Sequence, residues 1–445
     1  MTYAANPSVT TPSRHDLLAA FKGRNVQDIQ TPTLVIDRAV FIQNCEKMQR
    51  AVEALGWDFR AHIKTHKTAE GTRLQCQKTG TNRIIVSTLA EANAVIAAGL
   101  VADGTVKDIL YSMPLPVKLL QPLSHIKKEL EKYGGQLRLM IDNAAQIQHL
   151  EKGLKATGHS TEIWSIFLKL DIGYNSGAND LIYDFYERRA GLPPESDGMG
   201  LLIKTALQSP NISIFGTYTH AGWSYAATDG MGAAEILALE VAGANECGKR
   251  VLSIARELGL KEGESIDTGG LRLAVGATPT AHAAGAEWGA ARENAGVARG
   301  KMVGRVELHA GNYCLLDLQQ QATSLVGPES CALTVASTII SVYPKRKEVL
   351  CDAGGIAMSK DVGPIPGYGQ VVHPSALAGD WTLGRISQEH GILVAGKNVK
   401  TSPEIGDWLR IVPQHACMTA AGHPWFLVVD GGMEVADIWV PAKGW

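Results

Sequence analysis

The strongest constraint on the fold is an alternation of strand-like and helix-like segments that repeats eight times. Each strand-like run is apolar or alternates apolar with polar residues, and a run rich in Ala, Leu, Glu and Gln with helical spacing follows it. The strand-like runs are residues 57–64, 82–87, 108–113, 136–142, 163–171, 212–221, 271–276 and 302–310. Eight such repeats over roughly 260 residues predict an α/β fold, a closed (β/α)8 barrel of the TIM type. An open doubly wound sheet is the alternative, because it uses the same repeat.

The character of the chain changes after residue 310. Short β-rich runs such as CALTVASTIISVY and PWFLVVD are separated by Gly, Pro and Asp and show little helical spacing. We therefore expect a barrel over residues 31–310 and a second, mainly β C-terminal domain over residues 311–445. Residues 1–30 are expected to form an arm that packs with the β-domain and contains a short helix in SRHDLLAAF.

The composition limits the kinds of partner. Lys and Arg number 42 against 44 Asp and Glu, so no net charge favours nucleic acid or a membrane surface, and a small molecule is expected. No signal-like apolar stretch or run of eighteen apolar residues occurs, which predicts a cytoplasmic protein. Seven scattered cysteines predict reduced thiols rather than a disulfide framework.

Catalytic groups in such a barrel gather at the C-terminal ends of the strands. The residues at these expected ends are Lys64, Ser87, Ser112, Asp171, His220, Gly276 and His309. Lys64 lies in RAHIKTHKT, and we expect the charges of Arg60, His62, His66 and Lys67 to destabilise its amine proton. A neutral amine suits Schiff-base chemistry. The alternative is a solvated basic loop.

The segment VGATPTA (275–281) ends the seventh strand-like run. Gly276 allows close approach of a ligand, and the amides and hydroxyls of Ala277, Thr278 and Thr280 can bind a phosphate group. An ordinary turn containing Pro279 is the alternative. A reactive lysine together with a phosphate site indicates pyridoxal phosphate.

His415 and Cys417 stand two positions apart in VPQHACMT, so in an extended segment both side chains point to one face. An imidazole and a thiolate suit zinc, and few protein ligands leave positions for water or substrate. The alternative is a buried cysteine beside a histidine with a structural role.

RAHIKTHKT resembles the cofactor-lysine motif of the pyridoxal phosphate enzymes of the alanine-racemase fold type, in the branch that contains D-serine dehydratase and D-threonine aldolase. The resemblance runs from about residue 30 to the end of the chain, with its motifs in the family's order. The other motifs that carry it are TPTLVIDRA, HAGWSY (220–225), VGATPT, ELHAGNYCLLDLQQ (307–320), ISQEHGIL (386–393) and the HAC triplet.

The resemblance implies a role for individual residues. Lys64 matches the Schiff-base lysine, Thr278 and its neighbours match the phosphate site, and Tyr225 matches a tyrosine near the cofactor. We expect His220, Gly276 and Ala277 to bind the cofactor as well. His415 and Cys417 match the metal pair of the eukaryotic-type dehydratases. The aldolases usually have Asp at the second position, so Cys417 favours zinc and dehydration.

The implied function is that of a lyase that converts D-serine, or a related D-β-hydroxy amino acid, to a 2-oxo acid and ammonia with pyridoxal phosphate and zinc. Alternatives are a metal-dependent D-threonine aldolase, a racemase, and a non-catalytic pyridoxal phosphate-binding protein. The family also implies a homodimer, and His415 and Cys417 can then act on Lys64 of either subunit.

The sequence departs from the family pattern near the expected substrate pocket. Asn175 and Ser176 occupy positions where the family usually has His and Arg, and Trp223 stands where it often has His. A substrate other than D-serine, such as a hydroxyaspartate or D-threonine, is therefore an open alternative.

Overall fold

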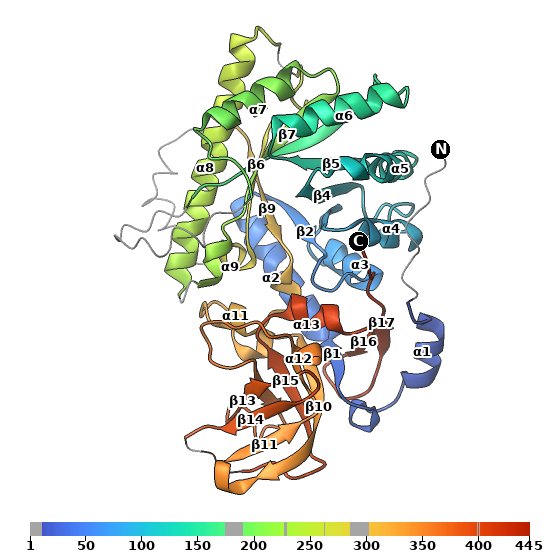
Figure 1. Ribbon diagram of the computed structural model, residues 1–445, viewed down its shortest axis with the longest axis vertical. Coiled ribbons are helices and arrows are strands. Elements are labelled where there is room, and N and C mark those ends of the chain that lie inside the picture. The colour runs from blue at the N-terminus through green and yellow to red at the C-terminus, as the bar shows by residue number, and fades with distance from the viewer. Residues whose placement is uncertain are drawn as a thin grey trace.

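The computed structural model describes residues 11–173, 190–226, 229–261, 263–284, 302–397, 399 and 401–445. Eight parallel strands close into a barrel in the upper half of the molecule (Figure 1). These strands are β2 (Asp58–His62), β3 (Arg83–Val86), β4 (Asp108–Pro114), β5 (Gln136–Ile141), β6 (Trp164–Leu170), β7 (Ile212–Thr219), β8 (Arg272–Val275) and β9 (Arg305–Ala310). Because β2 pairs with β9, the closed barrel is confirmed and the open sheet is wrong.

Helices follow the barrel strands and cover the outside of the barrel. They are α3 (Ala69–Lys78), α4 (Leu89–Ala97), α5 (Leu120–Glu131), α6 (Ala144–Ala156), α7 (Asp197–Gln208), α8 (Gly230–Glu257) and α9 (Thr278–Ala283), and α2 (Arg38–Leu55) precedes the first barrel strand. Asp37, Thr68 and Thr88 are the N-caps of α2, α3 and α4, and each side chain accepts a hydrogen bond from a backbone N–H of the first turn. These caps use donors that would otherwise lack partners.

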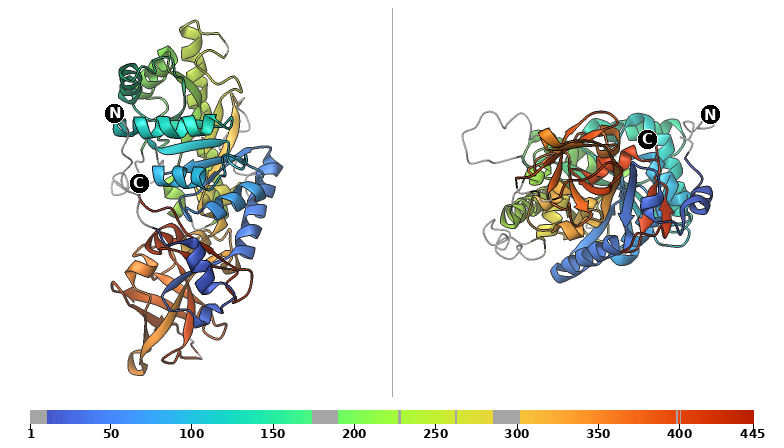
Figure 2. Two further views of the ribbon diagram at one scale, coloured as in Figure 1. Left: turned by 90° about the vertical axis from the view of Figure 1, so that its right-hand side faces the viewer. Right: turned by 90° about the horizontal axis from the view of Figure 1, so that it is seen from below.

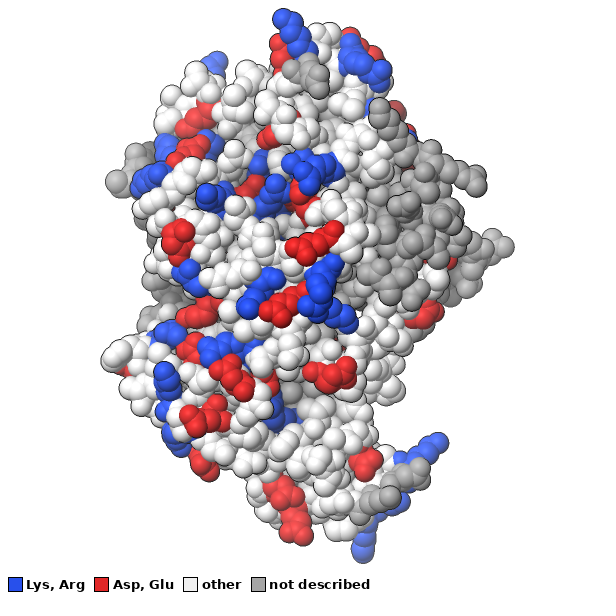
Figure 3. All heavy atoms as spheres, turned by 180° about the vertical axis from the view of Figure 1, so that it is seen from behind, with Lys and Arg blue, Asp and Glu red and all other residues white. Residues whose placement is uncertain are grey.

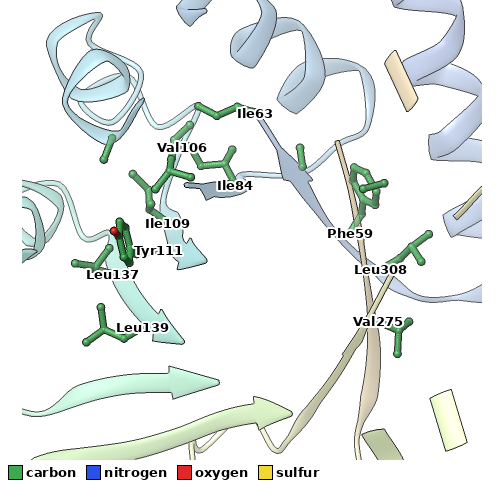
Figure 4. Packing of buried hydrophobic residues seen from close by; sticks show 14 of the residues in the cluster. Phe59, Ile63, Ile84, Val106, Ile109, Tyr111, Leu137, Leu139, Val275 and Leu308 are labelled. Carbon is green, nitrogen blue, oxygen red and sulfur yellow. The ribbon is translucent and has the colours of Figure 1, made fainter. Parts of the chain in front are cut away.

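Neighbouring residues of each barrel strand face opposite sides. Ile84, Ile109 and Leu139 belong to the large core between strands and helices, part of which is shown in Figure 4. The next residues along the same strands, Ile85, Leu110 and Met140, form a separate cluster with Phe167 and Phe215, as expected for the filled interior of a barrel.

The lower half of the molecule is a nine-stranded sheet, stacked on the barrel along the long axis (Figure 2). Its strands, in spatial order, are β11 (Glu348–Cys351), β14 (Gly391–Ala395), β13 (Trp381–Ile386), β12 (Gly369–His373), β15 (Trp408–Pro413), β10 (Leu333–Tyr343), β1 (Thr33–Asp37), β16 (Phe426–Val429) and β17 (Asp437–Trp439). Short helices in this half and its connections are η5 (Asn312–Cys314), α11 (Leu318–Gln321), η6 (Pro328–Ser330), η7 (Pro344–Arg346), α12 (Gly355–Met358) and α13 (Ala416–Gly422). The other short helices are η1 (Val26–Asp28), η2 (Val117–Leu119) and η3 (Gly222–Ala226).

Strand β1 corrects one expected boundary. The sequence placed residues 31–310 in the barrel, but β1 pairs antiparallel with β10 and parallel with β16. Its apolar residues Leu34, Val35 and Ile36 are fully buried on both faces of the sheet. A short apolar strand does not specify its partner locally, so only the assembled sheet shows where it belongs. The other expected domain limits stay predictions.

The first described helix, α1 (Arg14–Phe21), lies beside the sheet. Its Leu17, Leu18 and Phe21 pack against a cluster that contains Leu427 and Ile438 of β16 and β17. This packing connects the N-terminal segment to the nine-stranded sheet, and an ion pair between Arg14 and Glu70 of α3 also joins it to the barrel.

Acidic and basic side chains are mixed over the face seen in Figure 3. Within the described ranges, no helix has the length and hydropathy needed to cross a lipid bilayer. All seven cysteines are free thiols, as expected.

Candidate active site

Lys64 follows β2 at the mouth of the barrel, on the side that faces the nine-stranded sheet. Its side chain is exposed, and its backbone N–H donates to Nδ1 of His62 at 3.3 Å. The positive charge of Lys64 lowers the pKa values of His62, of Lys169 in β6 and of Cys417 in α13. Residues from the barrel and from the sheet half therefore converge on this amine.

The structure corrects the expectation that Arg60 and Lys67 are free positive charges beside Lys64. Arg60 is fully buried inside the barrel, where it forms ion pairs with Asp108 at 2.5 Å and with Glu307 at 2.7 Å. Lys67 is paired with Glu91 at 3.1 Å. Both cations are paired with carboxylates that the local sequence did not reveal, so neither is an unpaired charge beside Lys64.

The two histidines of RAHIKTHKT are neutral at pH 7. Burial, together with the charge of Lys64, holds the pKa of His62 well below its usual range, and burial lowers the pKa of His66 to about 4. Nδ1 of His66 accepts from the Thr68 N–H at 3.0 Å, so Nε2 carries the proton and donates to Gln75 at 2.9 Å. His66 thus shapes the loop that presents Lys64.

The expected phosphate segment joins the ends of β7, β8 and β9. Gly276 has φ +136°, and a Cβ there would lie 2.2 Å from the carbonyl oxygen of His309, so only glycine fits. Its carbonyl accepts from Nδ1–H of His220 at 2.8 Å. The Thr278 hydroxyl accepts from the Asn312 N–H at 3.3 Å, which leaves the hydroxyl proton for another acceptor.

Not every expected contact is available in this segment. The Ala277 N–H donates to the Thr280 hydroxyl at 3.0 Å, and that hydroxyl donates to the Ala277 carbonyl at 3.1 Å. Cofactor binding by Ala277 therefore stays a prediction. The side chain of Tyr225, and residues Asn175 and Ser176, lie outside the described part of the chain, whereas Trp223 is buried.

His415 and Cys417 lie at a junction between a strand and a helix. An extended segment was expected, but His415 is the N-cap of α13 and Cys417 is in its first turn. The two side chains still interact, because hydrogen bonding and charge between them shift both pKa values. Burial lowers the pKa of His415, but Cys417, Asp317 and Asp361 raise it to about 9.

The thiol of Cys417 has a reactive environment. Burial raises its pKa, but His415, Lys64 and Thr65 together bring the pKa below its ordinary value. Thr65 Oγ1 lies 3.1 Å from Cys417 Sγ. Because Thr65 follows Lys64 directly, the structure places the expected metal pair beside the lysine of the same chain. That His415 and Cys417 bind a metal, and that they act on the lysine of their own subunit, stay predictions.

Two carboxylates orient this junction. Nδ1 of His415 lies 2.6 Å from Oδ2 of Asp361, so it donates its proton there and leaves Nε2 for a metal. Asp317 is fully buried and accepts from the Ala416 N–H at 2.8 Å and from the Asn312 side chain at 2.6 Å. Asp317 therefore ties the junction to the end of β9.

An imidazole and a thiolate of lowered pKa are suitable zinc ligands. Over the residues that the structure describes, no group of three or more His, Cys, Asp or Glu side chains has the arrangement of a metal site. Two protein ligands would leave the remaining positions to water or substrate.

Known proteins match this chain over nearly its whole length. Residues 36–246 match the alanine racemase N-terminal domain and residues 332–429 match the serine dehydratase domain. D-serine dehydratase of Schizosaccharomyces pombe is 37% identical over 97% of this chain and 96% of that protein. The chain belongs to the D-serine dehydratase family. This family of lyases also includes the Saccharomyces cerevisiae enzyme, 32% identical over 97% of this chain and 100% of that protein.

A solved relative of the D-serine dehydratase family has the same architecture. D-threo-3-hydroxyaspartate dehydratase from Delftia sp. HT23 superposes with a TM-score of 0.74 at 27% identity, over 95% of this chain and 100% of that chain. A variant of that enzyme has been solved in a metal-free form and superposes with a TM-score of 0.76 at 26% identity, with the same coverage. The expected family, its fold type and its lyase class are confirmed.

Sequence reasoning missed Lys169, a further cation at the mouth. Its Nζ lies 4.8 Å from the ring centroid of Tyr218, and that ring stacks on His309 at 5.0 Å. The pKa of Lys169 is lowered to about 8, chiefly by burial and also by the charge of Lys64, although Asp142 and Asp171 raise it in part. The signal was a single lysine inside the apolar run IFLKL, which an apolar strand would not otherwise include.

Proposed function

We propose that this chain is a pyridoxal phosphate- and zinc-dependent dehydratase of D-serine, or of a related D-β-hydroxy amino acid, with a 2-oxo acid and ammonia as products. One observation carries the proposal, the 3.1 Å contact between Thr65 and Cys417. It brings the metal pair against the residue next to Lys64, so that an amine and a metal can act on one small substrate.

The residues at the mouth suit pyridoxal phosphate. Lys64 is exposed at the end of β2, and the Thr278 hydroxyl retains a proton that a phosphate oxygen can accept. His220 and Gly276 hold the two neighbouring segments together. When bound, the cofactor makes the proton on the substrate Cα acidic by accepting the electron pair into its ring. The Nζ of Lys64 would then take that proton from Cα.

The donor set at the junction suits zinc. Nε2 of His415 and Sγ of Cys417 would bind the ion, with Asp361 holding the imidazole in the required tautomer. Zinc supplies Lewis acidity that makes the substrate β-hydroxyl a better leaving group. The combination of Cys with His favours zinc over manganese or magnesium, which prefer oxygen ligands.

The relatives support this substrate class. The two yeast proteins of 37% and 32% identity are D-serine dehydratases, and the Delftia enzyme is a D-threo-3-hydroxyaspartate dehydratase. All three act by dehydration of a D-amino acid with a β-hydroxyl group, as their names state. Membership of this family speaks against a non-catalytic binding protein. A homodimer stays a prediction.

The test is an absorption spectrum of the purified protein, followed by addition of D-serine with and without a chelator and assay of pyruvate, ammonia and glycine. We expect a cofactor band in the visible range and pyruvate release that the chelator abolishes and added zinc restores. Glycine as the product in place of pyruvate would identify an aldolase instead. Pyruvate release that is insensitive to the chelator would overturn the zinc requirement.

D-threo-3-hydroxyaspartate should be tested in the same assay. Turnover of that substrate but not of D-serine would keep the dehydratase and change its substrate. A protein with the cofactor band but with no turnover of either substrate would overturn the proposed substrate class.

A further inference from the structure

Glu240 is a buried carboxyl group that the proposed chemistry does not use. It lies in the middle of α8 and has no exposed surface. Oε1 accepts a hydrogen bond from the Ala221 N–H at 2.7 Å, whereas Oε2 is buried and meets no hydrogen-bond partner among the described residues. A buried carboxyl group without a cation is costly if ionised, so its presence calls for a reason.

Glu240 lies where two segments of the mouth meet. Ala221 directly follows His220, whose ring donates to the carbonyl of Gly276. Thr280 and Gly276, in the expected phosphate segment, approach Glu240 closely enough to affect its carboxyl group. Helix α8 also packs along α9, which begins in that same segment. Glu240 thus connects helix α8 to the segments that follow β7 and β8.

The surroundings favour a neutral carboxylic acid. Burial raises the pKa of Glu240 to about 7, although the hydrogen bond from Ala221 and the nearby polar groups of Thr280 and Gly276 lower it in part. No charged side chain of the described residues shifts the pKa of Glu240, and the titratable side chains carried by the segments after β7 and in α9 are those of His220 and His282. The Thr280 hydroxyl already donates to Ala277, so its remaining lone pair suits a donor such as a protonated carboxyl group.

We propose that Glu240 is a positioning residue that acts as a neutral acid behind the Gly276–Thr280 segment and keeps that segment shaped for the phosphate group of the cofactor. This inference rests on the proposed function, because it assigns the phosphate to that segment. A neutral Glu240 can hold the segments after β7 and β8 in place without repelling the doubly negative phosphate group. An ionised Glu240 would oppose phosphate binding.

The experiment compares the binding of pyridoxal 5'-phosphate and of pyridoxal, which lacks the phosphate, by titration of the visible absorption band after removal of bound cofactor. We expect Glu240→Ala to weaken pyridoxal 5'-phosphate binding by about tenfold, the usual effect of losing one buried hydrogen-bonding group. Pyridoxal binding should change little. Glu240→Gln, neutral and of the same shape, should retain the wild-type affinity for both.

Glu246→Gln is the matched control, because Glu246 is an exposed glutamate of the same helix, paired with Lys249. It should leave both affinities unchanged. A loss of affinity in Glu240→Ala that is equal for pyridoxal and pyridoxal 5'-phosphate would overturn the role toward phosphate. So would wild-type affinity in Glu240→Ala. If Glu240→Ala does not fold, Thr280→Val replaces it, and the same selective loss is expected.

The pH dependence gives a second readout. Above about pH 7 wild-type Glu240 ionises, so binding of pyridoxal 5'-phosphate should weaken relative to Glu240→Gln, and the two should agree at lower pH. Equal affinities of the two proteins at every pH would overturn the neutral-acid assignment. If wild type itself binds no pyridoxal 5'-phosphate, the proposed function fails, and that outcome is separate from any difference among variants.

Discussion

The hydroxyl of Thr65 lies 3.1 Å from the thiol of Cys417, although 352 positions separate them in the chain. Thr65 belongs to the loop after the first barrel strand, and Cys417 belongs to the first turn of α13 in the sheet half. This contact places an amine and a pair of soft metal ligands around one space. The proposed mechanism, in which Lys64 takes the Cα proton and zinc activates the β-hydroxyl, depends on this contact.

The amine that carries the cofactor should be that of Lys64 alone. Lys64→Ala should lose the visible absorption band of the bound cofactor and all lyase activity, because no other described lysine occupies the end of β2. Lys67→Ala is the matched control, since Lys67 is paired with Glu91. It should keep the band. A band that persists in Lys64→Ala would show that another lysine holds the cofactor.

Removal of the thiol ligand should weaken metal binding and spare the cofactor. We expect Cys417→Ala to lose zinc affinity by at least about tenfold while its absorption band stays. Zinc content after dialysis and the spectrum measure the two effects separately. Met418→Ala changes the next residue, which is half exposed, and should leave zinc content unchanged. Full zinc occupancy in Cys417→Ala would exclude Cys417 as a ligand.

Asp361 should act on the metal through His415. Asp361→Asn removes the charge that fixes the imidazole tautomer, so zinc affinity should fall by about 10- to 100-fold, as measured by competition with a chelator. Glu389→Gln, an exposed carboxylate of the same half, is the control. Excess zinc should restore the activity of Asp361→Asn. Unchanged zinc affinity would make this hydrogen bond purely structural.

The lowered pKa of Lys169 predicts a pH-dependent stability. Its folded value is about 8, whereas lysine in an unfolded chain titrates near about 10.4. Between these values the unfolded chain binds more protons, so the free energy of unfolding rises with pH. Relative to Lys169→Met, wild type should gain about 1–2 kcal/mol between about pH 8 and about pH 10.

Urea unfolding at the two pH values measures this difference. Lys249→Met, which removes an exposed lysine, should show no such change with pH. A parallel pH dependence in wild type and Lys169→Met would mean that Lys169 titrates normally.

Much of the fold was predictable because its signals are local. The eight barrel strands alternate with helices over short windows, and several of these helices, such as α2, α3 and α4, begin at a capping Asp or Thr that the sequence displays. The segment of β1 was placed in the barrel domain, because its short apolar run LVI does not specify a partner. Its partners, β10 and β16, lie some three hundred or more positions away.

The candidate site shows the same contrast between what local sequence specifies and what long-range contacts decide. By itself, the sequence determined which chemical groups the protein has: a lysine after the first barrel strand, a glycine at 276, and a histidine and cysteine two positions apart. Only the tertiary structure decided which groups are neutral, paired or adjacent. Arg60 is paired with Glu307, burial lowers the pKa of Lys169, and Cys417 contacts Thr65. The physical reason is that charge and reactivity depend on burial and on partners distant in the chain, which no local pattern specifies.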